Sequence, residues 1–128
     1  MELHVGMKGR SETVVKVANT ARTMGSGTLE VFATPAMVAL MEQAAVQALP
    51  LPPGQSSVGT LIDIRHTAAT PLGSKVWAEA ELTAIDGRRL VFTVTAYDEK
   101  ELIGAGTHER FLVDEKRFVA KAAAKRDQ

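Results

Sequence analysis

Three side chains in the first half of the chain belong to residue types that catalyse acyl transfer, namely Thr34, Glu42 and His66. Glu42 is the only charged residue in a predicted helix over residues 35–49, and its helical neighbours are apolar. A carboxylate in such surroundings is desolvated, which raises its pKa unless it gains partners. Glu42 therefore either reaches the surface, forms a structural ion pair, or takes part in catalysis.

His66 lies next to the end of a strand with alternating polarity that is predicted over residues 57–67. The side chains expected on its inner face are those of Val58, Ile62, Ile64 and His66. One interpretation is a core histidine bonded to a backbone carbonyl. If the inner face packs on the helix, however, His66 and Glu42 can meet, and an imidazole held by a carboxylate is suited to act as a general base.

Thr34 directly precedes Pro35 at the start of the predicted helix, where a threonine commonly serves as the N-cap. A hydroxyl there also lies beside free backbone N–H groups that can stabilise an oxyanion. Thr34 and Glu42 are separated by about 12 Å along a helix axis, so one imidazole does not reach both within one chain. A second subunit or a bridging water could close that gap.

Two further segments are candidates for contact with a ligand. Gly59 lies in the segment Ser-Val-Gly-Thr, and it either admits a ligand close to the backbone or marks a bulge. Arg110 ends the segment Gly-Ala-Gly-Thr-His-Glu-Arg over residues 104–110, where it either binds an anionic or thioester group or forms a surface ion pair. The spacing of these residues does not decide between the alternatives.

The elements that position these residues are one helix and five strands, which predicts an α+β fold with a sheet wrapped around the helix. The strands are expected over residues 11–18, 57–67, 74–85, 88–97 and 102–113, with a loop over 19–29 and a hairpin turn at Asp86-Gly87. Since the helix is apolar on nearly every side, it must be enclosed, and one sheet covers only part of it. A homodimer is therefore expected.

Composition excludes several classes of function. The 128 residues are expected to form a single domain, with residues 113–128 as a C-terminal tail, and 15 basic residues balance 15 acidic ones, which argues against a nucleic-acid partner. There is no cysteine, and the three histidines are scattered, so no metal site or other cofactor is expected. No signal sequence or membrane-spanning segment is predicted, and we expect a cytoplasmic protein.

Taken together, these motifs resemble those of the fluoroacetyl-CoA thioesterase-like family of hotdog proteins. The resemblance covers roughly residues 10–113 in the same order. It is carried by Phe-Ala-Thr-Pro-Ala-Met-Val-Ala-Leu-Met-Glu (32–42), Val-Gly-Thr (58–60), His-Thr-Ala-Ala-Thr-Pro (66–71), Asp-Gly-Arg-Arg-Leu (86–90) and Gly-x-Gly-Thr-His-Glu-Arg (104–110).

The resemblance implies a hotdog homodimer, which could pair further into tetramers, with active sites at or near the subunit interface. It also implies a catalytic set of Thr34, Glu42 and His66, with Gly59 and Arg110 near the acyl group of an acyl-CoA substrate. The expected activity is hydrolysis of a short-chain acyl-CoA to free acid and CoA. Alternatives are a non-catalytic acyl-CoA-binding module or an enoyl-CoA hydratase.

One segment departs from the family pattern. The fluoroacetate-specific member carries an aromatic-rich lid ahead of the catalytic threonine, whereas residues 19–30 here contain no aromatic side chain. We therefore expect a broader or different short-chain acyl group.

Overall fold

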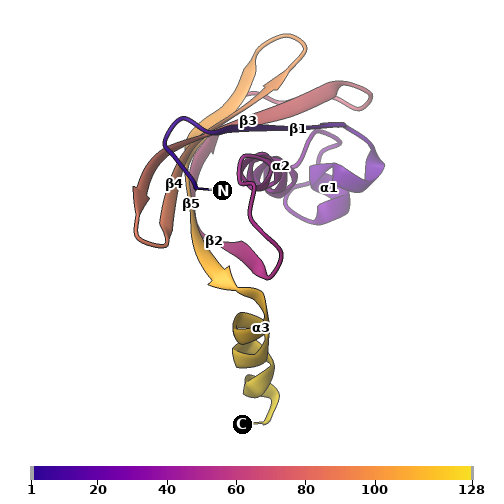
Figure 1. The fold of residues 1–128 in the computed structure, drawn as a ribbon. Coiled ribbons are helices and arrows are strands. Elements are labelled where there is room, and N and C mark those ends of the chain that lie inside the picture. The colour runs from indigo at the N-terminus through magenta and orange to yellow at the C-terminus, as the bar shows by residue number, and fades with distance from the viewer. Residues whose placement is uncertain (1, 128) are drawn as a thin grey trace.

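The computed structural model describes residues 2–127, in which a five-stranded antiparallel sheet curls around the helix α2 (Thr34–Gln47) (Figure 1). The sheet order is β1-β3-β4-β5-β2. Its strands are β1 (Lys8–Val14), β2 (Gln55–His66), β3 (Lys75–Asp86), β4 (Arg89–Asp98) and β5 (Leu102–Asp114). This is the predicted α+β arrangement, and Gly87 makes the expected turn between β3 and β4 with a φ of 60°.

Helix α2 buries one stripe of its surface against the sheet. The buried residues recur at helical spacing and are Met37, Leu40, Met41, Ala44 and Ala45. They pack into one core with inward side chains of β3 and β4 such as Leu82 and Phe92. Val46, by contrast, is 49% exposed. As expected, the sheet of a single chain covers only part of α2 and leaves another side of the helix exposed.

The N-terminal strand lies directly against the helix. A Cβ atom on Gly9 would lie 2.0 Å from the carbonyl oxygen of Ala44, and the Ser11 hydroxyl donates to Gln43 Oε1 at 2.9 Å. The strand begins at Lys8 and ends at Val14, so the predicted range 11–18 is shifted. The β-branched run that suggested a longer strand continues instead into a helical turn.

The segment between β1 and α2 was expected to be a loop over residues 19–29. It contains a 3-10 turn, η1 (Val17–Asn19), and a short helix, α1 (Ala21–Met24) (Figure 1). Local hydrogen bonds explain this, because the Thr20 hydroxyl accepts from the Thr23 amide at the start of α1. Gly25 then ends the helix with a φ of 77°.

Strand β2 contains a bulge at Thr60. Gly59 pairs with Arg110 and Leu61 with Glu109, so the extra residue shifts the alternation of side chains. As a consequence Gly59 and His66, seven residues apart, share the inner face with Ile62 and Ile64. Val58 pairs with Phe111 on the opposite face. Its expected place on the inner face is therefore wrong, and the bulge is the reason.

The two edges of the sheet differ in chemistry. The exposed residues of β1 include Lys8, Arg10 and Glu12, which discourage pairing with another strand. Strand β2 instead leaves Leu61 43% and Ile62 39% exposed. An edge with exposed apolar side chains is suited to pairing with a second strand.

The tail is partly helical, as expected. Asp114 caps the helix α3 (Glu115–Ala123) by accepting from the Arg117 amide at 3.0 Å, and a final turn, η2, spans Ala124–Asp127. Helix α3 projects away from the sheet (Figure 1). Among residues 2–127, none of the helices has the length and apolar character needed to cross a bilayer.

Candidate active site

Thr34 and His66 form a direct hydrogen-bonded pair. Their Oγ1 and Nδ1 atoms are 2.7 Å apart, at the first residue of α2 and the last residue of β2. The N-cap of α2 is Ala33, and no side chain caps the helix. The predicted capping role of Thr34 is therefore wrong, and its hydroxyl is instead engaged with the imidazole. The pair borders a cavity of about 280 Å³.

The environment of His66 favours its neutral form. Burial lowers the pKa of His66, and the nearby Ala68 backbone opposes this effect. The Nε2 atom of His66 is buried and has no hydrogen-bond partner among residues 2–127. A neutral imidazole bonded to a hydroxyl can accept its proton, which is the requirement for a general base.

Glu42 lies in a second cluster, with Arg110 and Gly59. Its Oε2 is 3.5 Å from Arg110 Nη1, and a Cβ on Gly59 would lie 2.6 Å from the same oxygen. The Glu42 side chain is 39% exposed, so it is not the fully desolvated carboxylate that the sequence suggested. Gly59 is therefore needed here because the carboxylate occupies the space of a side chain. Glu42 and Gly59 border a cavity of about 220 Å³.

Arg110 is almost entirely buried, with 6% of its surface exposed. Its Nε donates to Ser57 Oγ at 2.7 Å and its Nη2 to the Ser57 carbonyl at 2.9 Å. Burial lowers the pKa of Arg110, while Glu42 raises it, and a guanidinium stays protonated in either case. Of the two alternatives predicted for Arg110, the surface ion pair is therefore wrong, because the side chain is buried.

His108 also belongs to this cluster, and sequence reasoning missed it. It is 1% exposed, and its Nε2 lies 3.2 Å from Arg110 Nη1. The available signal was its position two residues before Arg110, which places both on one face of a strand.

Within one chain the two clusters stay apart. No hydrogen bond or ion pair between the described residues joins Glu42 to His66, and they border different cavities. Along β2 the seven residues from Gly59 to His66 span about 20 Å. The structure therefore brings Thr34 to His66 and Glu42 to Gly59 and Arg110, but leaves these two groups separate.

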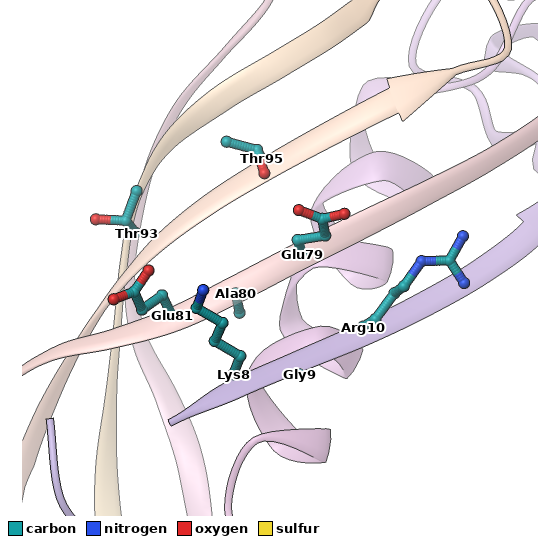
Figure 2. Close-up of a pocket in the computed structure, with 8 residues that line it drawn as sticks. All are labelled: Lys8, Gly9, Arg10, Glu79, Ala80, Glu81, Thr93 and Thr95. Carbon is teal, nitrogen blue, oxygen red and sulfur yellow. The ribbon is translucent and has the colours of Figure 1, made fainter. Parts of the chain in front are cut away.

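A third cavity, of about 400 Å³, lies on the sheet face that points away from α2. Figure 2 shows the side chains around it, which come from β1, β3 and β4: Lys8, Arg10, Glu79, Glu81, Thr93 and Thr95. Two cations and two carboxylates offset one another there, so this surface offers no excess charge for an anionic ligand such as CoA. It is remote from both clusters.

Comparison with known proteins identifies the family. The family described as fluoroacetyl-CoA-specific thioesterase, FlK, matches residues 15–116. The chain belongs to this family. It is 50% identical over 98 residues to the fluoroacetyl-CoA thioesterase of Streptantibioticus cattleyicolor, covering 75% of this chain and 70% of that protein.

Solved structures of the fluoroacetyl-CoA thioesterase family share the fold. The fluoroacetyl-CoA thioesterase FlK superposes with a TM-score of 0.91 at 41% identity, over 98% of each chain. A Thermus thermophilus protein described as a thioesterase superfamily member gives a TM-score of 0.88 at 30% identity, covering 98% of this chain and 95% of that one. These matches confirm the predicted hotdog fold, the family resemblance and the expectation of a thioester hydrolase.

Proposed function

We propose that this protein hydrolyses a short-chain acyl-CoA to the free acid and CoA, with Thr34, His66 and Glu42 as catalytic residues. The observation that carries the proposal is the 2.7 Å hydrogen bond between the Thr34 hydroxyl and the neutral His66 imidazole beside a cavity. A hydroxyl and an imidazole in this arrangement are the parts needed for acyl transfer. Membership in a thioesterase family supports the choice of substrate.

In the proposed reaction, His66 Nδ1 removes a proton from Thr34 Oγ1 or from a water molecule that replaces it. The oxygen attacks the thioester carbonyl, and backbone N–H groups at the start of α2 stabilise the oxyanion. The carbon–sulfur bond then breaks and His66 returns the proton to the CoA thiolate. When water attacks, the free acid forms at once; when a side-chain oxygen attacks, a water molecule that gives its proton to His66 then cleaves the acyl-enzyme bond, releasing the free acid and returning that proton to the side chain. Glu42, held by Arg110, orients His66 or attacks directly, and an acyl adduct trapped on Thr34 or on Glu42 would separate these routes.

A homodimer would unite the two clusters. Antiparallel pairing of β2 with its two-fold copy centred on Asp63 sets Ile62 opposite Ile64 on one face and places His66 beside the bulge at Gly59 of the partner subunit. The partner's Glu42 and Arg110 would then approach Thr34 and His66. Two features support this assembly: β2 is an edge strand with exposed apolar residues near its middle, and the buried Nε2 of His66 lacks a partner among residues 2–127. An acceptor for a buried imidazole nitrogen removes a cost of about 1–3 kcal/mol.

The acyl group is proposed to be short but not restricted to fluoroacetyl. The cavity beside Thr34 and His66 is also bordered by Phe32, and the segment ahead of Phe32 contributes only the small side chains of Ala21, Ser26 and Val31. Side chains of this size leave room for a larger acyl chain than aromatic ones would. A cytoplasmic location is part of the same proposal.

The test is thiol release from a panel of short-chain acyl-CoAs, including acetyl-CoA and fluoroacetyl-CoA. We expect T34A, E42A and H66A each to reduce kcat/KM by about 100-fold or more, since general acid–base groups contribute about that much. T34S should retain activity because it keeps the hydroxyl. The matched controls T93A, E81A and H4A change the same residue types at exposed positions remote from both clusters and should leave kcat/KM unchanged.

The other two readings of the sequence give different results in this assay. An acyl-CoA-binding module would bind the panel tightly without releasing thiol, and a hydratase would add water to an enoyl-CoA and leave the thioester intact. Either result would overturn the proposed function.

A further inference from the structure

His108 takes no part in the reaction steps above, yet it lies at the centre of the second cluster. Its ring is 1% exposed and stacks on Phe92, with ring centroids 6.1 Å apart at 28°. Its Nδ1 lies 2.7 Å from the carbonyl oxygen of Leu61, just after the bulge in β2. A buried imidazole with both nitrogens engaged is held in one orientation.

The partners of His108 define where its proton lies. The Leu61 carbonyl can only accept, so Nδ1 carries the hydrogen, and Arg110 Nη1 can only donate, so Nε2 presents its lone pair. Burial lowers the pKa of His108, the Leu61 carbonyl opposes this, and the charge of Arg110 adds to the lowering. His108 is therefore the neutral tautomer that accepts a hydrogen bond from Arg110.

The guanidinium of Arg110 is consequently held at three of its nitrogen atoms. Ser57 accepts from Nε and Nη2, and His108 accepts from Nη1. An Nη atom has two hydrogens, and with one directed to His108 the other is available to Glu42 Oε2 at 3.5 Å. The Nη1 hydrogens are fixed in the guanidinium plane, so without His108 the whole plane could tilt away from Glu42 and Gly59 with no acceptor at Nη1 to oppose it.

We propose that His108 is a positioning residue for thioester hydrolysis, and that its Nε2 aims the Arg110 guanidinium at Glu42 beside Gly59. The proposal rests on the proposed function, because it assigns this effect to turnover through Glu42 and Arg110. In this role His108 does not touch the substrate and does not transfer a proton.

The test compares two variants that each preserve one half of the imidazole. In H108N the amide can still donate to the Leu61 carbonyl but nothing occupies the place of Nε2. In H108Q the carbonyl oxygen lies near the place of Nε2 and can accept from Arg110. We expect kcat/KM to fall by about tenfold or more in H108N, since a hydrogen bond to a charged group is lost, and to stay within about threefold of wild type in H108Q.

A control separates positioning from stability. I103V changes a fully buried residue of the same strand and should lower Tm while leaving kcat/KM unchanged. If H108N and H108Q lose activity equally and in proportion to their loss of Tm, His108 is only structural and the proposal is overturned.

Nuclear magnetic resonance of the arginine side chains gives a second readout that needs no turnover. In wild type, the Arg110 Nη1 hydrogens should be protected from exchange, and H108N should lose that protection while the Nε hydrogen, bonded to Ser57, keeps it. H108Q should restore it. Unchanged Nη1 protection in H108N would overturn the proposal. If wild type releases no thiol from any acyl-CoA, the proposed function fails, whereas this measurement still decides whether His108 positions Arg110.

Discussion

His66 combines a hydrogen bond to a hydroxyl with a lowered pKa, and this has consequences for pH dependence. Because burial lowers the pKa of His66, the base form should persist below the ordinary imidazole range. We predict that kcat/KM is constant through neutral pH and falls only in mildly acidic solution, as His66 becomes protonated. A pH profile of kcat/KM between pH 5 and 9 checks this, and a loss of activity centred above pH 6.5 would contradict it.

The same shift affects stability. Since the unfolded chain binds a proton to this imidazole more readily than the folded chain, the contribution of His66 is present at neutral pH. It is lost as pH falls below the unfolded pKa.

Gly59 offers a direct test of the second cluster. An added Cβ would lie 2.6 Å from Glu42 Oε2, which is the mobile end of a side chain, so the carboxylate should move while the fold is kept. We predict that G59A lowers kcat/KM by about tenfold with a small change in Tm. The double variant G59A/E42A should be no less active than E42A, because both changes act through the same carboxylate. Additive losses would mean that Gly59 acts elsewhere.

Several site residues could be found from sequence because their types are unusual in their setting. Glu42 is the one charge on an apolar helix, and His66 interrupts an apolar face. His108 was not found because its role depends on Leu61, which bonds to its ring, and on Ser57, which holds Arg110. Both lie about fifty positions earlier and come close only through strand pairing. Long-range pairing of this kind leaves little trace in local patterns.

At the scale of elements, helix and strand positions could be predicted well where polarity alternates. The range of α2 (Thr34–Gln47) agrees within two residues with the prediction, since Pro35 and Pro50 bound it. A bulge was one of the alternatives predicted at Gly59, and β2 contains one beside it, at Thr60. Its effect on the faces of the strand could not be predicted, because a single extra residue leaves the composition of β2 unchanged. The shift of β1 likewise depends on its fit against α2, which is a tertiary effect.

The contact between β1 and α2 predicts a strong effect of a small substitution. In G9A the new methyl group would overlap the Ala44 carbonyl and approach Ala48 N to 2.6 Å, and neither backbone can yield easily. We expect a loss of about 3 kcal/mol or more in the free energy of unfolding, measured by urea denaturation. The neighbouring control S11A loses one exposed hydrogen bond to Gln43 and should change stability by less than about 1 kcal/mol.

For the whole molecule, the separation of the clusters within one chain predicts complementation between defective subunits. If each site combines Thr34 and His66 of one subunit with Glu42 of its partner, a dimer of one T34A chain and one E42A chain contains one intact site. Mixing the two inactive homodimers after reversible dissociation should then restore about a quarter of wild-type activity, because half of the dimers are mixed and each has one working site.

The control for this experiment is a mixture of T34A with H66A. Both changes then fall in the same half of the site, so no intact site forms and activity should stay absent. Failure of T34A and E42A to complement would show that the residues act within one chain or that the subunits do not exchange, and labelled subunits distinguish these results.

The bulge at Thr60 has a consequence for how this sequence can vary. In a regular strand, two residues face the same side only when their positions differ by an even number. Gly59 and His66 are seven positions apart, and both face α2 because the bulge adds one residue between them. Replacing Thr60 by serine keeps that count, whereas removing it turns Gly59 and everything before it in the strand to the opposite side. The number of residues in this segment therefore matters more than the identity of its side chains. Between Gly59 and His66, we expect single-residue insertions or deletions to abolish function at positions where substitutions are accepted.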